Sequence, residues 1–145
     1  MSGDPKARGL LRAAALLLFC AAGVGCTNAT KIYVQSTDRT NAGNVLHMMV
    51  RSVDAKTAAT AEAYQEMALL LFAQSQDESV LSTQPIFPGR LAITTVEDKA
   101  AKSVVLYFFF TSPGDHWRVQ LTNPLPAEVY VDLGQNQIER LQIKR

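Results

Sequence analysis

The feature that most constrains this chain of 145 residues is an apolar run near its amino end. Residues 13–22 are apolar, the small residues 23–25 follow them, and Lys6, Arg8 and Arg12 precede them. This order of positive, apolar and small segments is typical of a secretory signal peptide. The run is shorter than the about 20 apolar residues that a membrane-spanning helix needs. The residues after it must therefore supply the folded domain.

Cys26 comes directly after the small residues. The segment resembles a bacterial lipoprotein signal, in which the leader is removed in front of a cysteine and that cysteine is acylated. Removal would leave Cys26 as the one cysteine, and an unpaired thiol is a liability in an oxidising compartment. A lipid on Cys26 removes the thiol and anchors the protein, since each buried methylene contributes about 0.8 kcal/mol. The alternatives are an N-terminal membrane helix and a secreted protein with a free thiol.

We expect three parts: a cleaved signal peptide over 1–25, a lipidated tether over 26–31 and a single domain over 32–145. Hydrophobic residues make up 48% of the chain and charged residues 19%, as in ordinary globular proteins. The 14 basic and 13 acidic residues become 11 and 12 when the three bases and one acid of the leader are subtracted. A near-neutral domain without a basic face argues against nucleic acid as a partner. Apart from the covalent lipid, we expect no cofactor.

Short β-prone segments alternate with turn signals along the domain. Val129, Val131 and Leu133 alternate with more polar residues and are predicted to point inward, and the same reasoning places Leu141 and Ile143 inward. Seven strands are predicted, over residues 32–36, 45–53, 91–96, 103–111, 117–121, 128–133 and 138–143. The fourth of these is the most hydrophobic and is expected to lie centrally, buried on both faces.

One stretch has helical periodicity instead. Residues 61–73 place Met67 and Leu71 on one face, which predicts an amphipathic helix, and Thr57 or Thr60 could cap a helix before it. Short alternating strands favour a mainly β fold, an antiparallel two-sheet β-sandwich with one α-helix inserted after the second strand. The absence of strand–helix–strand alternation disfavours a parallel α/β sheet.

Residue types for catalysis or metal binding are sparse. The two histidines, His47 and His116, lie in a predicted strand and a predicted turn. Segment 112–116 contains a serine, an aspartate and a histidine, but a triad depends on geometry, and a turn is the better interpretation. Glu97 and Asp98 are adjacent and are predicted to be solvated. We therefore expect no enzyme activity, no catalytic residue, no metal and no small-molecule substrate.

Two further segments need an interpretation. Residues 83–90 contain a Pro-Gly pair and are predicted to form a turn. Phe108, Phe110 and Trp117 either fill the core of the sandwich or form a platform for an apolar ligand. The core interpretation is favoured, because large aromatic side chains anchor the packing of two sheets.

The order of these motifs resembles the TssJ family of outer-membrane lipoproteins of the type VI secretion system. The segments that carry the resemblance are the polar loop and strand over 40–53, the helix over 64–72, the Phe-Pro-Gly turn at 87–89, the stretch from 107–110 to 117–119, and the closing hairpin over 129–141. The resemblance implies a transthyretin-like sandwich that binds the periplasmic C-terminal domain of TssM and, through it, TssL. It also implies attachment to the periplasmic face of the outer membrane.

In that family the loop between the first two strands is the main partner contact, and here it corresponds to residues 35–44. The exposed candidates in this loop are Thr37, Asp38, Arg39, Thr40 and Asn41. Replacing residues 38–41 with glycine and serine is expected to weaken TssM binding and to leave the fold intact. Without the resemblance, the same loop reads as a plain solvent loop. Two other functions stay open: a secretin pilotin and a carrier of a small apolar ligand.

Overall fold

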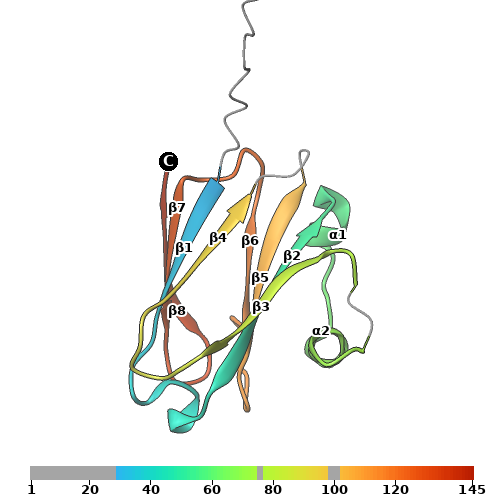
Figure 1. Cartoon of the computed structure of the whole chain (residues 1–145). Helices are drawn as coiled ribbons and strands as arrows, with labels where there is room; N and C mark the ends of the chain where they lie inside the picture. Colours follow the sequence, from blue (N-terminus) through green and yellow to red (C-terminus); the bar gives the residue numbers. More distant parts are fainter. Residues whose placement is uncertain (1–28, 75–76, 98–101) are drawn as a thin grey trace, which may run out of the picture.

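The computed structural model describes residues 29–74, 77–97 and 102–145, and in these ranges the chain forms two four-stranded sheets packed face to face (Figure 1). We name them the β1 sheet, with strand order β4-β1-β7-β8, and the β5 sheet, with order β3-β2-β5-β6. The strands are β1 Ala29–Gln35, β2 Leu46–Val53, β3 Val80–Ile86, β4 Ala92–Glu97, β5 Ser103–Phe109, β6 Arg118–Leu121, β7 Glu128–Leu133 and β8 Ile138–Lys144. The helical turns are η1 Thr40–Gly43, α1 Ala55–Ala59 and α2 Tyr64–Leu71. The predicted mainly β two-sheet sandwich is confirmed.

One strand pair departs from the expected antiparallel arrangement. β1 and β7 run parallel, with Ile32 opposite Val129 and Val34 opposite Val131. The remaining described pairs are antiparallel. Between β1 and β7 the chain passes through the other sheet, so no tight hairpin imposes an antiparallel pair.

The main core fills the space between the two sheets. It takes the inward side chains of alternating strands, such as Val129 and Val131 on β7 and Leu106 and Phe108 on β5, all of which are fully buried. Leu133 is also buried, which confirms the inward face predicted for this strand. Residues of β5 are buried along its whole length, as the sequence predicts for a central strand.

A second, smaller core explains why both faces of β5 are buried. α1 and α2 lie outside the β5 sheet (Figure 1), where Ala58 of α1 and Met67 of α2 pack with Met49, Tyr107 and Phe109 of the sheet. α2 lies within the range 61–73 where a helix is predicted, and α1 is a second short helix before it that was not predicted. No helix among the described residues is long and apolar enough to cross a membrane.

The start of α1 is fixed by Asp54 rather than by a threonine. The Asp54 carboxylate accepts a hydrogen bond from the Thr57 backbone N–H at 2.7 Å and another from the Thr57 hydroxyl at 3.0 Å. These bonds satisfy a donor that the first helical turn leaves free, and they lower the pKa of Asp54. The cap expected at Thr57 or Thr60 is therefore wrong, because Asp54 precedes both and already fills that role.

β3 occupies much of the segment that the sequence predicts as a turn. The strand continues through Pro85 to Ile86, and only the residues after it turn, with the Arg90 N–H donating to the Phe87 carbonyl at 3.1 Å. A proline is tolerated here because β3 is an edge strand and one side of it makes no ladder bonds.

β8 also differs from the prediction. Leu141 and Ile143 stand opposite Val131 and Val129, so they point toward the core as expected, yet they are 39% and 48% exposed. β8 is the last described strand of its sheet, and its inner face is not fully covered by the β5 sheet. Their predicted direction is therefore correct, but the opposite sheet does not cover them.

The connections between successive strands lie at the two ends of the sandwich. The β1–β2, β3–β4, β5–β6 and β7–β8 connections lie at one end, which we name the loop end. β1 begins at the other end, near the C-terminus, and we name this the tether end (Figure 1). Cys26, the leader over 1–25 and Asp98 lie outside the described residues.

Candidate partner-binding site

The β1–β2 connection at the loop end contains the five residues that the sequence proposes as a partner contact. Thr37, Asp38 and Arg39 are exposed. Thr40 is fully buried and Asn41 is only 4% exposed. The expectation that all five are exposed is thus wrong for Thr40 and Asn41. Their polar atoms are satisfied by segments far away in the sequence, which a local pattern cannot reveal.

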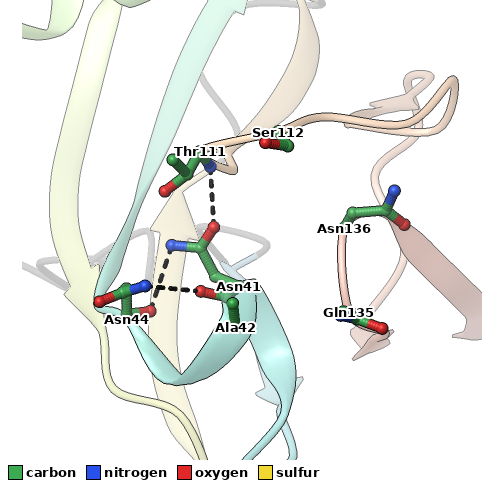
Figure 2. A pocket seen from close by; sticks show the side chains of 7 residues that line it. All are labelled: Asn41, Ala42, Asn44, Thr111, Ser112, Gln135 and Asn136. Atoms are coloured by element: carbon green, nitrogen blue, oxygen red, sulfur yellow. Dashed lines mark hydrogen bonds between the residues drawn. The ribbon is translucent and has the colours of Figure 1, made fainter.

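Asn41 ties three segments of the loop end together (Figure 2). Its side-chain Oδ1 accepts from the Thr111 N–H at 2.7 Å, beyond the end of β5. Its Nδ2 donates to the carbonyls of Asn44 and Val45 at 3.2 and 3.3 Å. Its own N–H donates to the Gln135 carbonyl at 2.8 Å, in the β7–β8 connection. The loop is therefore a fixed part of the fold.

Thr40 makes a similar link. Its hydroxyl accepts from the Thr37 N–H at 3.0 Å and donates to the Leu133 carbonyl at 3.2 Å. The first bond closes the loop on itself, and the second fastens it to the end of β7. Both hydroxyl bonds are buried or half-buried, where replacing the group would leave polar atoms without partners.

The backbone of η1 is left-handed over three successive residues. Asn41, Ala42 and Gly43 have φ values of 52°, 54° and 79°. Glycine adopts this region freely and asparagine tolerates it, whereas an alanine there costs roughly 1–2 kcal/mol. The bonds of Thr40 and Asn41 therefore hold a strained turn whose exposed tip is Ala42.

The β3–β4 turn lies against the β1–β2 connection. The Ser36 hydroxyl is within 3.2 Å of the carbonyls of both Phe87 and Arg90. Asp38 packs on Gly89 so closely that a Cβ at Gly89 would lie 2.2 Å from the Asp38 carboxylate. Gly89, with φ of 76°, thus fits for two reasons, its backbone conformation and this contact. The two connections form one continuous surface.

Two cavities flank the loop. The first, of about 370 Å³, has no charged residue in its lining (Figure 2). Its lining residues are Asn41, Ala42, Asn44, Thr111, Ser112, Gln135 and Asn136. The second, of about 570 Å³, lies on the side of the β3–β4 turn and carries charges from Arg90, Asp132 and Glu139.

Exposed apolar residues border this surface. Val45 is 44% exposed and Phe87 is 50% exposed. They directly precede and follow the paired residues Leu46 and Ile86 of β2 and β3, so they lie side by side. Polar groups around a few apolar contacts are typical of a reversible protein interface. Val45 and Phe87 were not predicted to lie on this surface. The signal in the sequence that could have indicated it is an apolar residue at the boundary between a strand and a turn.

A buried ionic cluster lies elsewhere, beneath the helices. Glu62, between α1 and α2, contacts Arg51 of β2 at 2.8 Å and Arg118 of β6 at 3.0 Å. The Tyr107 hydroxyl donates to the same carboxylate. Burial, together with the hydrogen bond to Glu62, raises the pKa of Tyr107 to about 12. The phenol therefore stays neutral at ordinary pH, and the cluster fastens the helical segment to the sheet.

The remaining candidates do not assemble into a chemical site. His47 is half-buried with its ring edge toward Phe72, and His116 is exposed. Within the described ranges, no group of three or more histidine, cysteine or carboxylate side chains could hold a metal ion. Glu97 is exposed, as expected for a solvated residue.

The aromatic platform does not form either. Phe108 and Phe110 point into the main core, whereas Trp117 packs on the opposite face of the β5 sheet beside Tyr64 and Tyr107. The three side chains thus belong to two separate cores, and the interpretation of them as core residues fits this arrangement.

A comparison with protein families identifies the chain. The family model described as IglE, N-terminal domain, matches residues 47–133, which is 87 of the 145 residues. The chain belongs to the IglE N-terminal domain family. This family groups lipoproteins of the type VI secretion system, and the predicted likeness to TssJ is confirmed. No curated protein matches this IglE-family chain in sequence.

Solved structures share the fold of this IglE-family chain. The type VI secretion lipoprotein TssJ1 from Pseudomonas aeruginosa superposes with a TM-score of 0.61 at 13% identity, covering 82% of this chain and 98% of TssJ1. Serratia marcescens Lip, described as a membrane-bound component of the type VI secretion system, gives 0.60 at 12% identity, covering 81% and 98%. A chain of the structure described as the TssM C-terminal domain (869-1107) from EAEC gives 0.56 at 13% identity, covering 78% and 99%.

These comparisons describe secretion-system proteins rather than enzymes. The family match begins in β2 and ends with β7, so it includes neither the β1–β2 connection nor β8. Those two segments of the IglE-family chain must be interpreted from their own geometry.

Proposed function

We propose that this protein is a lipoprotein of the type VI secretion membrane complex, held on the periplasmic face of the outer membrane by a lipid on Cys26. Its loop end binds the periplasmic C-terminal region of TssM, which also joins TssL to the assembly. Membership of the IglE N-terminal domain family and the shared fold of proteins described as type VI secretion lipoproteins support this role.

The observation that carries the proposal is the position of the β1–β2 connection. β1 begins at Ala29, three residues after Cys26, and its seven residues span roughly 23 Å. The loop that follows therefore lies at the opposite end of the sandwich from the anchor (Figure 1). A lipid on Cys26 would hold the tether end at the membrane and direct the loop end into the periplasm, toward a partner from the inner membrane.

The chemistry of the loop end suits a protein partner. Its surface combines uncharged and charged polar side chains with the apolar Val45 and Phe87. The bonds of Thr40 and Asn41 hold this surface in shape before any partner arrives, so little conformational entropy is lost on binding. A preformed polar surface favours specific and reversible assembly.

A binding titration tests the proposal. The processed lipoprotein in detergent is titrated with the periplasmic C-terminal region of TssM from the same cell, and compared with the double variant Asp38→Ser/Arg39→Ser. We expect saturable binding that the variant weakens by roughly tenfold. Thr40 and Asn41 are left unchanged, because replacing the whole 38–41 segment would also remove their buried hydrogen bonds and mix a stability effect with a binding effect.

The matched control is Glu97→Ser/Lys102→Ser at the tether end, which also removes one acid and one base from exposed positions. This control should bind like the wild type. Equal affinities for the wild type and the loop variant would show that TssM binds another surface of the protein. If the wild type does not bind, TssM is not the partner.

A further inference from the structure

The β8 edge leaves one side of the main core open. Leu141 and Ile143 are 39% and 48% exposed, although their partners Val131 and Val129 on β7 are fully buried. β6, the nearest strand of the opposite sheet, has only four residues. A groove of about 330 Å³ lies between the two edges, lined by residues of β6 and β8. Apolar side chains that point toward the core thus meet solvent along β8.

β8 lacks the proline of β3 and the short length of β6, and the charged side chains of Arg140 and Lys144 are what protect its free edge. β3 carries Pro85, β6 is short, and β4 directs buried or half-buried side chains at the core. Native proteins usually shield a free edge with prolines, short strands or bulges. β8 has seven residues and no proline, and its register shift lies at its first residues. Beyond its pairing with β7, the described part of the chain gives β8 one backbone hydrogen bond, from Ile138 to His116.

We infer that the free edge of β8 binds an extended segment of a partner chain, which adds a fifth strand to the β1 sheet. Such a strand would pair with the free backbone groups of residues 140–144 and would cover Leu141 and Ile143. Because strand side chains alternate between faces, the segment carries apolar residues two positions apart on its core side.

Charge narrows the identity of this segment. Arg140 and Lys144 lie on the outer face of β8, opposite Asp132 and Glu128 of β7, and their side chains are 66% and 63% exposed. A strand added on the free side fits best with acidic residues opposite these two bases, since opposite charges on neighbouring strands stabilise a sheet. The segment is therefore an alternating one, acidic on its outer face and apolar on its inner face.

A second copy of this chain does not have that chemistry. The regular part of β8, residues 140–144, contains two bases and no acid. Antiparallel self-pairing in the register centred on Gln142 puts Arg140 opposite Lys144. Like charges directly opposite each other destabilise the pair. The charge pattern favours a different chain.

The edge is continuous with the proposed TssM surface. The β7–β8 connection contributes Gln135 and Asn136 to the loop-end cavity, and β8 follows directly (Figure 2). The inference thus rests on the proposed function: the segment belongs to the periplasmic C-terminal region of TssM, which would contact the loop end and β8 together.

The test titrates that TssM region into the processed lipoprotein in detergent and into the variant Leu141→Lys/Ile143→Lys. The matched control is Ile93→Lys/Thr95→Lys, which adds the same charges at exposed positions of the other edge strand of the same sheet. We expect the β8 variant to bind roughly tenfold more weakly and the control to bind within about twofold of the wild type. Hydrogen exchange on the wild type should show the amides of residues 140–144 becoming protected in the complex.

Each other result has a separate meaning. Wild-type binding without protection of residues 140–144, and with equal affinity of the β8 variant, overturns the inference and leaves the proposed function in place. Failure of the wild type to bind overturns both. Sedimentation of the free protein gives the third result: a dimer that the β8 variant converts to a monomer would assign the edge to a second copy and overturn the TssM segment.

Discussion

Asn41 shows how one amide side chain can fix a functional surface. It bonds with four different residues through its side chain and backbone N–H, and these lie in the loop itself, after β5 and in the β7–β8 connection. Each hydrogen bond contributes about 1 kcal/mol net, but a buried group left without a partner costs about 1–3 kcal/mol. Asparagine also tolerates the left-handed backbone that this position requires.

Asn41→Ala should lower the free energy of unfolding by roughly 2–3 kcal/mol. The substitution removes three side-chain bonds, leaves the Thr111 N–H without its acceptor and places alanine at a positive φ. Urea unfolding followed by circular dichroism measures the change. A loss below about 0.5 kcal/mol would show that the loop is held by other contacts.

The neighbouring residue Ala42 provides a control in which the free energy of unfolding should rise instead of fall. Ala42 has a φ of 54° and is exposed, so Ala42→Gly relieves the backbone without removing a side-chain contact. We expect this variant to be more stable by up to about 1 kcal/mol in the same unfolding experiment. If Ala42→Gly destabilises the protein as much as Asn41→Ala does, the positive φ at Ala42 does not strain the folded state.

At the scale of elements, Glu62 determines how the helical segment sits on the sandwich. α1 has five residues and α2 eight, too few to be stable alone, so their order comes from packing. Glu62 sits between them and joins them to β2 through Arg51 and to β6 through Arg118. Arg51 is only 8% exposed, and this carboxylate compensates its buried positive charge.

Glu62→Ala should destabilise the protein by roughly 3–5 kcal/mol, because it leaves the buried Arg51 guanidinium without its counter-charge. Arg118→Ala should cost less, since the Arg118 side chain is 26% exposed and Glu62 keeps Arg51 as a partner. Denaturant unfolding of the two variants shows which of them loses more stability. The reverse order would mean that Arg118 is the principal partner of Glu62.

Local patterns allow the strands to be predicted where burial alternates, as in β7, and where a strand is apolar throughout, as in β5. They fail where a feature depends on distant residues. Pro85 marks a turn by its local chemistry, and only its place on a sheet edge allows a strand through it. The apolar pattern of β8 correctly predicts which side chains point toward the core. It cannot show that the opposite sheet leaves those side chains partly uncovered.

The same limit applies to the candidate site. Thr37, Asp38 and Arg39 are exposed, as their composition predicts. Thr40 and Asn41 are equally polar, yet they are buried because Leu133 and Thr111, about 90 and 70 residues away, complete their hydrogen bonds. The role of Glu62 could not be predicted for the same reason, since its arginine partners lie 11 and 56 positions away.

At the scale of the whole molecule, the proposed function assigns different roles to the two ends of the sandwich. The proposed anchor adjoins the start of β1, and the proposed partner surface lies beyond its end (Figure 1). The binding surface can therefore be tested separately from membrane attachment.

Cys26→Ser should release the protein from the membrane fraction while leaving TssM binding in detergent unchanged, because lipid and partner are assigned to opposite ends. Fractionation followed by immunoblotting measures the first effect, and the titration described above measures the second. A variant that stays in the membrane fraction would contradict the lipid anchor, and one that loses TssM binding would contradict the separation of roles.

The place of β1 inside its sheet has a mechanical consequence. β1 pairs with β4 on one side and with β7 on the other. If the lipid holds one end of this strand and the secretion complex pulls on the other, the force runs along the strand and loads its hydrogen bonds on both sides in shear. Bonds loaded in shear share the force, whereas bonds peeled from one end break in succession. The strand that would link the proposed anchor to the proposed partner is therefore the one best placed to resist a force between them.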